Sequence, residues 1–282
     1  MHRKSDTSSG GTFCPDCISH PCPIPDEINL ILNDRTSGSL ALLNRLITAL
    51  EHELQQSEVS AEAFRKLVIR IRGKLTHFAA IENFLATLIT HSGQRKNFPG
   101  EALHFIAAYR LYWEDSAGKI TDNFLQQCAP KGLTILTHSH SETIHSLLNQ
   151  LHAKELPFRV LQTLSAPGEE GKISYERMCE QQLQAELIED ENIRESLASV
   201  DLILVGCDAL LADKFLNKVG TRAILEQAKQ WNKPSCLVTE SRKEITNPDW
   251  KNKLTKHPLF EWVPLNLMEW VVTETKLPQA AR

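Results

Sequence analysis

The sequence contains no long apolar run, few aromatic residues and no excess of positive charge. No stretch approaches the roughly 20 apolar residues that span a bilayer, and the first residues, rich in Ser, Thr and Gly, lack the apolar core of a secretory signal. Lys and Arg number 31 against 35 Asp and Glu, so no overall positive field attracts a nucleic acid. These absences predict a soluble, cytoplasmic protein that binds neither nucleic acid nor membrane.

Cysteine is also scarce, and its seven residues are an odd number. Four lie in segments typical of a packed domain, unlike a secreted disulfide scaffold, so we expect reduced thiols. The other three, Cys14, Cys17 and Cys22, share a Ser-, Gly- and Pro-rich segment with His20. A thiolate pair two residues apart can bind zinc, but no second such pair occurs elsewhere. Two interpretations of residues 1–25 stay open: a zinc site formed by these four residues, or a flexible, redox-sensitive tail without a cofactor.

Two apolar periodicities divide the rest of the chain. Between residues 26 and 127, apolar residues recur at three- and four-residue spacing, as in Leu43, Leu46 and Leu50, which is typical of amphipathic helices. From residue 128 to 282, short apolar runs alternate with polar turns and helical stretches. Such alternation predicts a parallel sheet covered on both faces. The sequence therefore predicts an α/β protein with an N-terminal helical domain over 26–127 and a Rossmann-like parallel-sheet domain over 128–282.

The apolar runs of the second domain give expected positions for its strands and helices. The strands are expected at 133–136, 158–161, 186–188, 202–205 and 236–238. The helices are expected at 142–153, 174–185, 192–198 and 221–231. Ligands of such sheets bind outside the carboxyl ends of the strands, so the residues that follow each strand are the first candidates for a site.

The first expected strand is followed by Thr137-His138-Ser139-His140-Ser141, and Glu142 then opens a helix. Small hydroxyl residues at a helix N-terminus leave free amide groups and the positive end of the helix dipole, which suit a phosphate. An ordinary serine cap without a ligand would give the same pattern. This segment is therefore a candidate phosphate site or a plain helix cap.

The fourth expected strand is followed by Gly206-Cys207-Asp208 and then by a loop that ends in Asn217-Lys218-Val219-Gly220-Thr221. A carboxylate directly after a buried strand costs several kcal/mol unless it is paired or solvated. We expect Lys218 to be the partner of Asp208. The pair can be structural, but its position at the strand ends favours a ligand site.

These segments resemble the superfamily of the α, β and δ regulatory subunits of eukaryotic translation initiation factor 2B, ribose-1,5-bisphosphate isomerase and methylthioribose-1-phosphate isomerase. The likeness extends from Ile31 to Thr275. Residues 200–209 look like the family's aspartate loop, and residues 217–221 look like its NKxGT motif. Residues 33–39 look like a DRTSGA-type turn, where Arg35 would bind a ligand phosphate with two hydrogen bonds.

The sequence departs from the isomerases at the residues that carry their chemistry. The resemblance implies a catalytic cysteine after the first strand, used together with the aspartate, but Ser139 stands at that position. A serine hydroxyl is far less acidic than a thiol, so that mechanism should be impaired or lost. Leu164 stands where the family usually has a glutamate. The segment 238–243 is more similar to the AESFK-type segment of the regulatory subunits.

Two functions follow from these residues. The first is a regulatory protein that binds a phosphorylated sugar or nucleotide and lacks cysteine-dependent isomerase chemistry. The expected ligand-binding residues are Arg35, Gly38, His138, Ser139, Ser141, Asn217 and Lys218. The alternative is an aldose-ketose isomerase acting on a phosphorylated ribose, with Asp208 as the catalytic group, Ser139 at the cysteine position, and His138 or His140 in a rearranged acid-base set. The resemblance also implies a homodimer formed through the α/β domain.

Overall fold

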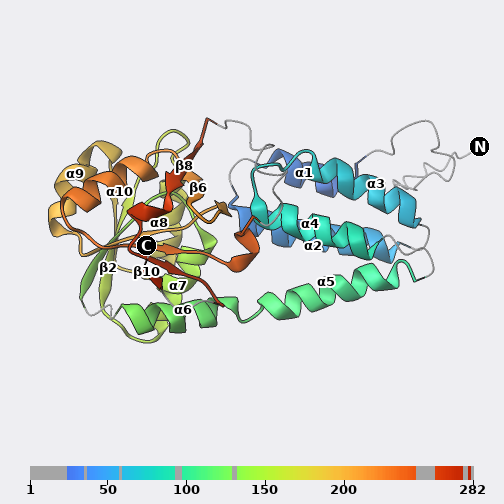
Figure 1. The fold of residues 1–282 in the computed structure, drawn as a ribbon, viewed down its shortest axis with the longest axis horizontal. Helices are drawn as coiled ribbons and strands as arrows, with labels where there is room; N and C mark the ends of the chain where they lie inside the picture. Colours follow the sequence, from blue (N-terminus) through green and yellow to red (C-terminus); the bar gives the residue numbers. More distant parts are fainter. Residues whose placement is uncertain are drawn as a thin grey trace, which may run out of the picture.

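The computed structural model describes residues 24–34, 37–56, 59–92, 97–128, 132–245, 258–275 and 279–280. The molecule has two lobes, a bundle of helices and an α/β lobe (Figure 1). Cys14, Cys17, His20 and Cys22 lie outside the described residues, as does Arg35. The zinc interpretation and the phosphate contact of Arg35 therefore stay predictions.

The helical lobe forms where the three- and four-residue spacing predicts helices. Its helices are α1 (Asp26–Asn33), α2 (Ser39–Gln55), α3 (Ala61–Arg72), α4 (Ala79–His91) and α5 (Gly100–Trp113), followed by α6 (Ser116–Gln127). Leu43, Leu46 and Leu50 are fully buried and pack in one cluster with Phe64 and Phe84. Burial of this apolar stripe, at about 25 cal/mol per Å², is what holds the bundle together.

The α/β lobe contains a seven-stranded sheet with the strand order β10-β9-β7-β4-β1-β2-β3. Its strands are β1 (Leu133–Thr137), β2 (Phe158–Thr163), β3 (Ala185–Ile188), β4 (Leu202–Val205), β7 (Ser235–Val238), β9 (Trp270–Val272) and β10 (Gln279–Ala280). The first six are parallel to one another, and β10 is antiparallel to β9. The predicted fold class is confirmed.

Helices cover both faces of this sheet (Figure 1). On one face, α7 (Glu142–Ala153), α8 (Glu170–Glu180) and α6 contribute to a cluster with the apolar side chains of the strands. On the other face, α9 (Ile193–Ser196) and α10 (Thr221–Gln230) do the same. The domain boundary at residue 128 stays a prediction. The helix α6 precedes this boundary and already packs on the sheet.

Two expectations for local structure were wrong. The loop expected before Asn217 contains a strand, because β5 (Ala209–Leu210), β6 (Lys214–Lys218) and β8 (Phe260–Pro264) form a second, antiparallel sheet. The helix expected at 174–185 is α8, which begins at Glu170 and ends at Glu180. Gln182 then has a φ of 59°, a left-handed conformation that cannot continue a helix, and the chain enters β3.

The second sheet lies between the lobes and connects them (Figure 1). The amide of Ala79, the first residue of α4, donates to the carbonyl of Asp208 at 3.1 Å. The Asn83 side chain donates to the carbonyls of Arg242 and Glu244 at 2.9 and 2.8 Å. The helical lobe is therefore held directly against the loops that follow β4 and β7.

None of the described helices combines the length and the apolar character that crossing a membrane requires.

Gly171 allows α8 to begin directly on the end of β2. A Cβ atom at this position would lie 1.8 Å from the carbonyl oxygen of Thr163 and 2.8 Å from that of Leu164. We therefore expect Gly171→Ala to lower the free energy of unfolding by about 3 kcal/mol, measured by urea denaturation. Gly100→Ala is the matched control, because nothing lies within 4 Å of its Cβ position. Equal stability of both variants would contradict the packing.

Candidate functional site

A small cleft of about 20 Å³ lies where the ends of β1 and β4 meet the start of α2. It is lined by Gly38, Ser39, Leu40, His140, Ser141, Glu142, Cys207, Asp208, Asn217 and Lys243. Of the residues expected to bind a ligand, Gly38, Ser141 and Asn217 meet here beside Asp208. This volume is enough for about one water molecule, so a larger ligand fits only if the residues that line the cleft move apart.

Two helix N-termini meet at this cleft. The 17-residue helix α2 begins there with Gly38 as its cap, and the 12-residue helix α7 begins there with Ser141 as its cap. The Ser141 hydroxyl accepts from the amide of Ile144 at 3.4 Å. The other amides of each first turn have no partner within their helix, and both dipoles place positive charge at the cleft. This arrangement favours an anion.

Gly206 makes the close approach of these elements possible. A Cβ atom on Gly206 would lie 2.6 Å from the Ser141 hydroxyl oxygen and 3.1 Å from the Ser141 Cβ. Any side chain at position 206 would therefore push the start of α7 away from the end of β4. The glycine holds the α7 amides next to the carboxylate of Asp208.

Lys218 is not the partner of Asp208, and this expectation was wrong. The charged group that acts most strongly on Asp208 is Lys243. Lys243 is buried, and its Nζ donates to the carbonyl of Cys207 at 2.7 Å. Burial raises the pKa of Asp208, whereas Lys243 and a hydrogen bond from Ser39 oppose that rise. A carboxyl group with a raised pKa can hold a proton and exchange it with a sugar hydroxyl.

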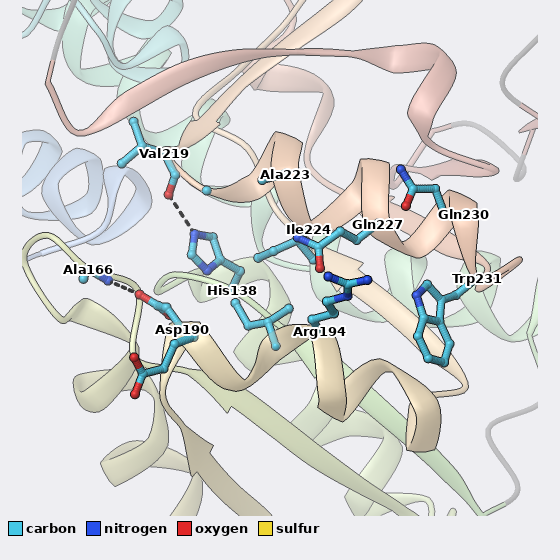
Figure 2. A pocket seen from close by; sticks show the side chains of 13 residues that line it. His138, Ala166, Asp190, Arg194, Val219, Ala223, Ile224, Gln227, Gln230 and Trp231 are labelled. Carbon is cyan, nitrogen blue, oxygen red and sulfur yellow. Dashed lines mark hydrogen bonds between the residues drawn. The ribbon is translucent and has the colours of Figure 1, made fainter.

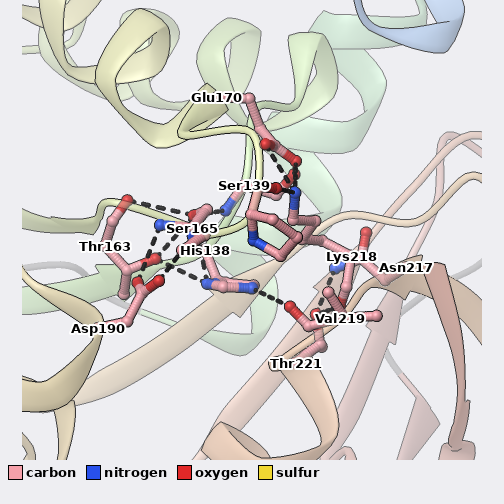
Figure 3. Close-up of polar contacts among 12 residues, drawn as sticks. His138, Ser139, Thr163, Ser165, Glu170, Asp190, Asn217, Lys218, Val219 and Thr221 are labelled. Atoms are coloured by element: carbon pink, nitrogen blue, oxygen red, sulfur yellow. Dashed lines mark hydrogen bonds and ion pairs between the residues drawn. The ribbon is translucent and has the colours of Figure 1, made fainter. Parts of the chain in front are cut away.

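Lys218 instead forms a second cluster with Glu170 and Ser139 (Figure 3). Its side chain is 0% exposed, and its Nζ lies 2.7 Å from the Glu170 carboxylate and also donates to the carbonyl of Pro167. The Ser139 hydroxyl donates to the same carboxylate at 3.2 Å. A carboxylate therefore does follow β2, six residues beyond Leu164, where the sequence had suggested that one was missing.

His138 lies in a different environment from Asp208. Its Nε2 donates to the carbonyl of Val219 at 3.0 Å, and its Nδ1 lies 2.7 Å from the Thr163 hydroxyl, which can donate to it (Figure 3). Burial lowers the pKa of His138. His138 itself lines a cavity of about 550 Å³ between α9 and α10, together with Val219 and Arg194 (Figure 2). His138 is not among the residues that line the Asp208 cleft.

His140 is the histidine that lines the Asp208 cleft. Its side chain is 6% exposed, and its Nε2 lies 3.2 Å from Arg177 and 3.3 Å from Glu142. Its Nδ1 is buried without a hydrogen-bond partner. A buried polar atom without a partner costs free energy.

Cys207 lines the same cleft but does not present a reactive thiol. Its side chain is buried in the apolar cluster that covers the α10 face, and its Sγ contacts the Thr239 hydroxyl at 3.2 Å. Burial raises the pKa of the thiol to about 11. The thiol is therefore protonated at neutral pH and acts as a small apolar residue.

Comparison with known families matches residues 37–257, most of the chain, to the initiation factor 2 subunit family. The chain belongs to this family. The resemblance inferred from the aspartate loop and the NKxGT motif is thereby confirmed.

Relatives of the initiation factor 2 subunit family include enzymes and translation factors. Ribose 1,5-bisphosphate isomerase from Archaeoglobus fulgidus is 24% identical over 165 residues, which cover 58% of this chain and 53% of the isomerase. The chain thus aligns with about half the length of that relative. The crystal structure of translation initiation factor eIF-2B from Pyrococcus horikoshii OT3 has a TM-score of 0.76 at 18% identity and covers 90% of this chain and 97% of its own. The 5-methylthioribose 1-phosphate isomerase of the same organism has a TM-score of 0.70 at 16% identity, covering 88% and 82%.

Sequence reasoning missed Lys243, which lines the cleft, and Glu170, which pairs with Lys218. Lys243 follows β7, which neighbours β4, so the rule that sites lie beyond the carboxyl ends of strands could have found it. Glu170 lies beyond a six-residue connection after β2 and gave no local signal. His140 was considered only together with His138, which turned out to point elsewhere.

The Glu142 carboxylate beside the cleft should make stability depend on pH. Hydrogen bonding to His140, together with Arg177, lowers its pKa from 4.5 to about 2. Its contribution to stability is therefore complete above pH 4.5 and is lost as the pH falls towards 2. We expect Glu142→Gln to destabilise the protein at pH 7 and to cost clearly less at pH 3, measured by urea unfolding. Glu176→Gln, exposed on α8, is the control and should change stability little at either pH.

Proposed function

We propose that this protein binds a phosphorylated sugar or nucleotide in the Asp208 cleft and acts as a regulatory binding protein without cysteine-dependent isomerase chemistry. The observation that carries this proposal is the convergence of the α2 and α7 N-termini beside Asp208. The amides of the two first helical turns, which have no partner within their own helices, offer donors to a phosphate.

Space for the rest of a ligand lies next to the cleft. A cavity of about 330 Å³ shares Leu40 and Glu142 with the cleft and continues to Trp113, Thr143 and Arg242. A phosphate at the helix N-termini would therefore place its sugar or base in a pocket with both apolar and polar walls, as small-molecule sites usually have.

The absence of a reactive thiol supports binding without isomerisation. Ser139 stands at the position of the family cysteine, and its hydroxyl is hydrogen-bonded to Glu170. Cys207, which neighbours Asp208, carries a protonated, buried thiol. Asp208 therefore lacks the sulfur group with which the related isomerases are expected to share the reaction.

The alternative is an aldose-ketose isomerase acting on a phosphorylated ribose. The raised pKa of Asp208 favours it, because a carboxyl group that titrates closer to neutral pH is a better general acid and base. The relative from Archaeoglobus fulgidus carries the name of such an enzyme. Turnover separates this alternative from the binding function.

Ligand binding is tested by calorimetric titration with ribose 5-phosphate and adenosine 5′-monophosphate. We expect saturable binding of at least one of them, and no ketose product by NMR when ribose 1,5-bisphosphate or methylthioribose 1-phosphate is added. Gly38→Ala places a methyl group in the cleft, 3.6 Å from His140, and should weaken binding about tenfold. Gly73→Ala, also at a helix end, is the control and should bind normally. Turnover would favour the isomerase, and no binding would overturn the site.

We also propose that the protein is a cytoplasmic homodimer formed through the α/β lobe. The chain has a mass of 31.8 kDa, so light scattering after size-exclusion chromatography should give twice this mass. Trp231 is an exposed aromatic residue at the end of α10 (Figure 2). A monomeric mass at micromolar concentration would contradict this proposal.

A further inference from the structure

Lys218 and the Asp208 cleft differ in how many of their donors are already used. Lys218 is fully buried, and its Nζ donates both to Glu170 and to the carbonyl of Pro167. The Asp208 cleft instead has the amides of two helix N-termini and an unpartnered His140 nitrogen. The Asp208 cleft can therefore accept an anion, whereas the position at Lys218 already contains the Glu170 carboxylate.

The charges around the cleft reinforce this difference. Glu170 is close enough to Asp208 to contribute to its raised pKa, so two carboxylates face the same region. Lys218 neutralises Glu170, and Lys243 acts on Asp208. A second phosphate placed at Lys218 would have to displace Glu170 or lie against its carboxylate, and repulsion between like charges in a buried region is strong.

Glu170 is held in this position by the chain around it. It is the first residue of α8, where a carboxylate interacts favourably with the helix dipole. Its carboxylate also accepts from the Ser139 hydroxyl at 3.2 Å and is only 23% exposed. The α8 dipole and the Ser139 hydroxyl therefore both retain the carboxylate on Lys218.

We propose that Glu170 determines ligand specificity by occupying the anion position at Lys218, so that the site accepts a ligand with one phosphate and rejects a bisphosphate. The inference rests on the proposed binding function. The part of the ligand next to Ser139 and Glu170 is then a neutral sugar hydroxyl, which can donate to the carboxylate.

The experiment compares ribose 5-phosphate with ribose 1,5-bisphosphate by calorimetric titration. We expect the wild-type protein to bind the monophosphate at least about tenfold more tightly. Glu170→Gln keeps the shape of the side chain but removes its charge, so it should shift the ratio of the two dissociation constants about tenfold towards the bisphosphate. Glu169→Gln removes the same charge one residue away, at an exposed position, and should leave the ratio unchanged.

Each outcome decides the inference. A wild-type protein that binds the bisphosphate as tightly as the monophosphate, or an unchanged ratio in Glu170→Gln, overturns the inference alone. If Glu170→Gln does not fold, as judged by circular dichroism, the wild-type ratio decides by itself. If neither ligand binds the wild-type protein, the proposed function falls together with the inference.

Discussion

The site depends on the contact between the helical lobe and the loop that follows β4. The first amide of α4 donates to the carbonyl of Asp208, and Asn83 on the same helix holds two carbonyls after β7. Buried backbone groups must find partners, so these bonds determine where the bundle sits on the sheet. They thereby place the N-terminus of α2 opposite that of α7, which neither lobe alone could do.

Charge pairing within the cleft gives the site its chemical character. Lys218 is paired with Glu170, and Arg177 with Glu142, while Lys243 acts on Asp208. A buried charge without a partner is far more costly than a buried pair, so each of these cations is already matched. The donors left for a ligand are then mainly neutral: backbone amides and the His140 ring. Such a site can select for charge number as well as for shape.

Membership of the initiation factor 2 subunit family does not decide between binding and catalysis, because this fold carries both translation factors and sugar-phosphate isomerases. The decision lies in individual side chains. A hydroxyl stands at position 139 where the resemblance implies a thiol, and the thiol at position 207 is buried with a raised pKa. Asp208 has a raised pKa, but the thiol that the resemblance implies beside it is replaced by the Ser139 hydroxyl.

The sequence by itself determined the fold class and the placement of most of the regular elements of the α/β lobe. The helix at 142–153 and the strand at 202–205 have the predicted bounds, because apolar periodicity is a local property of the chain. Only the tertiary structure decided which charges meet. Glu170 lies 48 residues before Lys218, and the sheet order, which places β2 and β4 on either side of β1, is what brings the ends of these strands together. Ion pairs depend on distance in space, and spacing along the chain does not encode it.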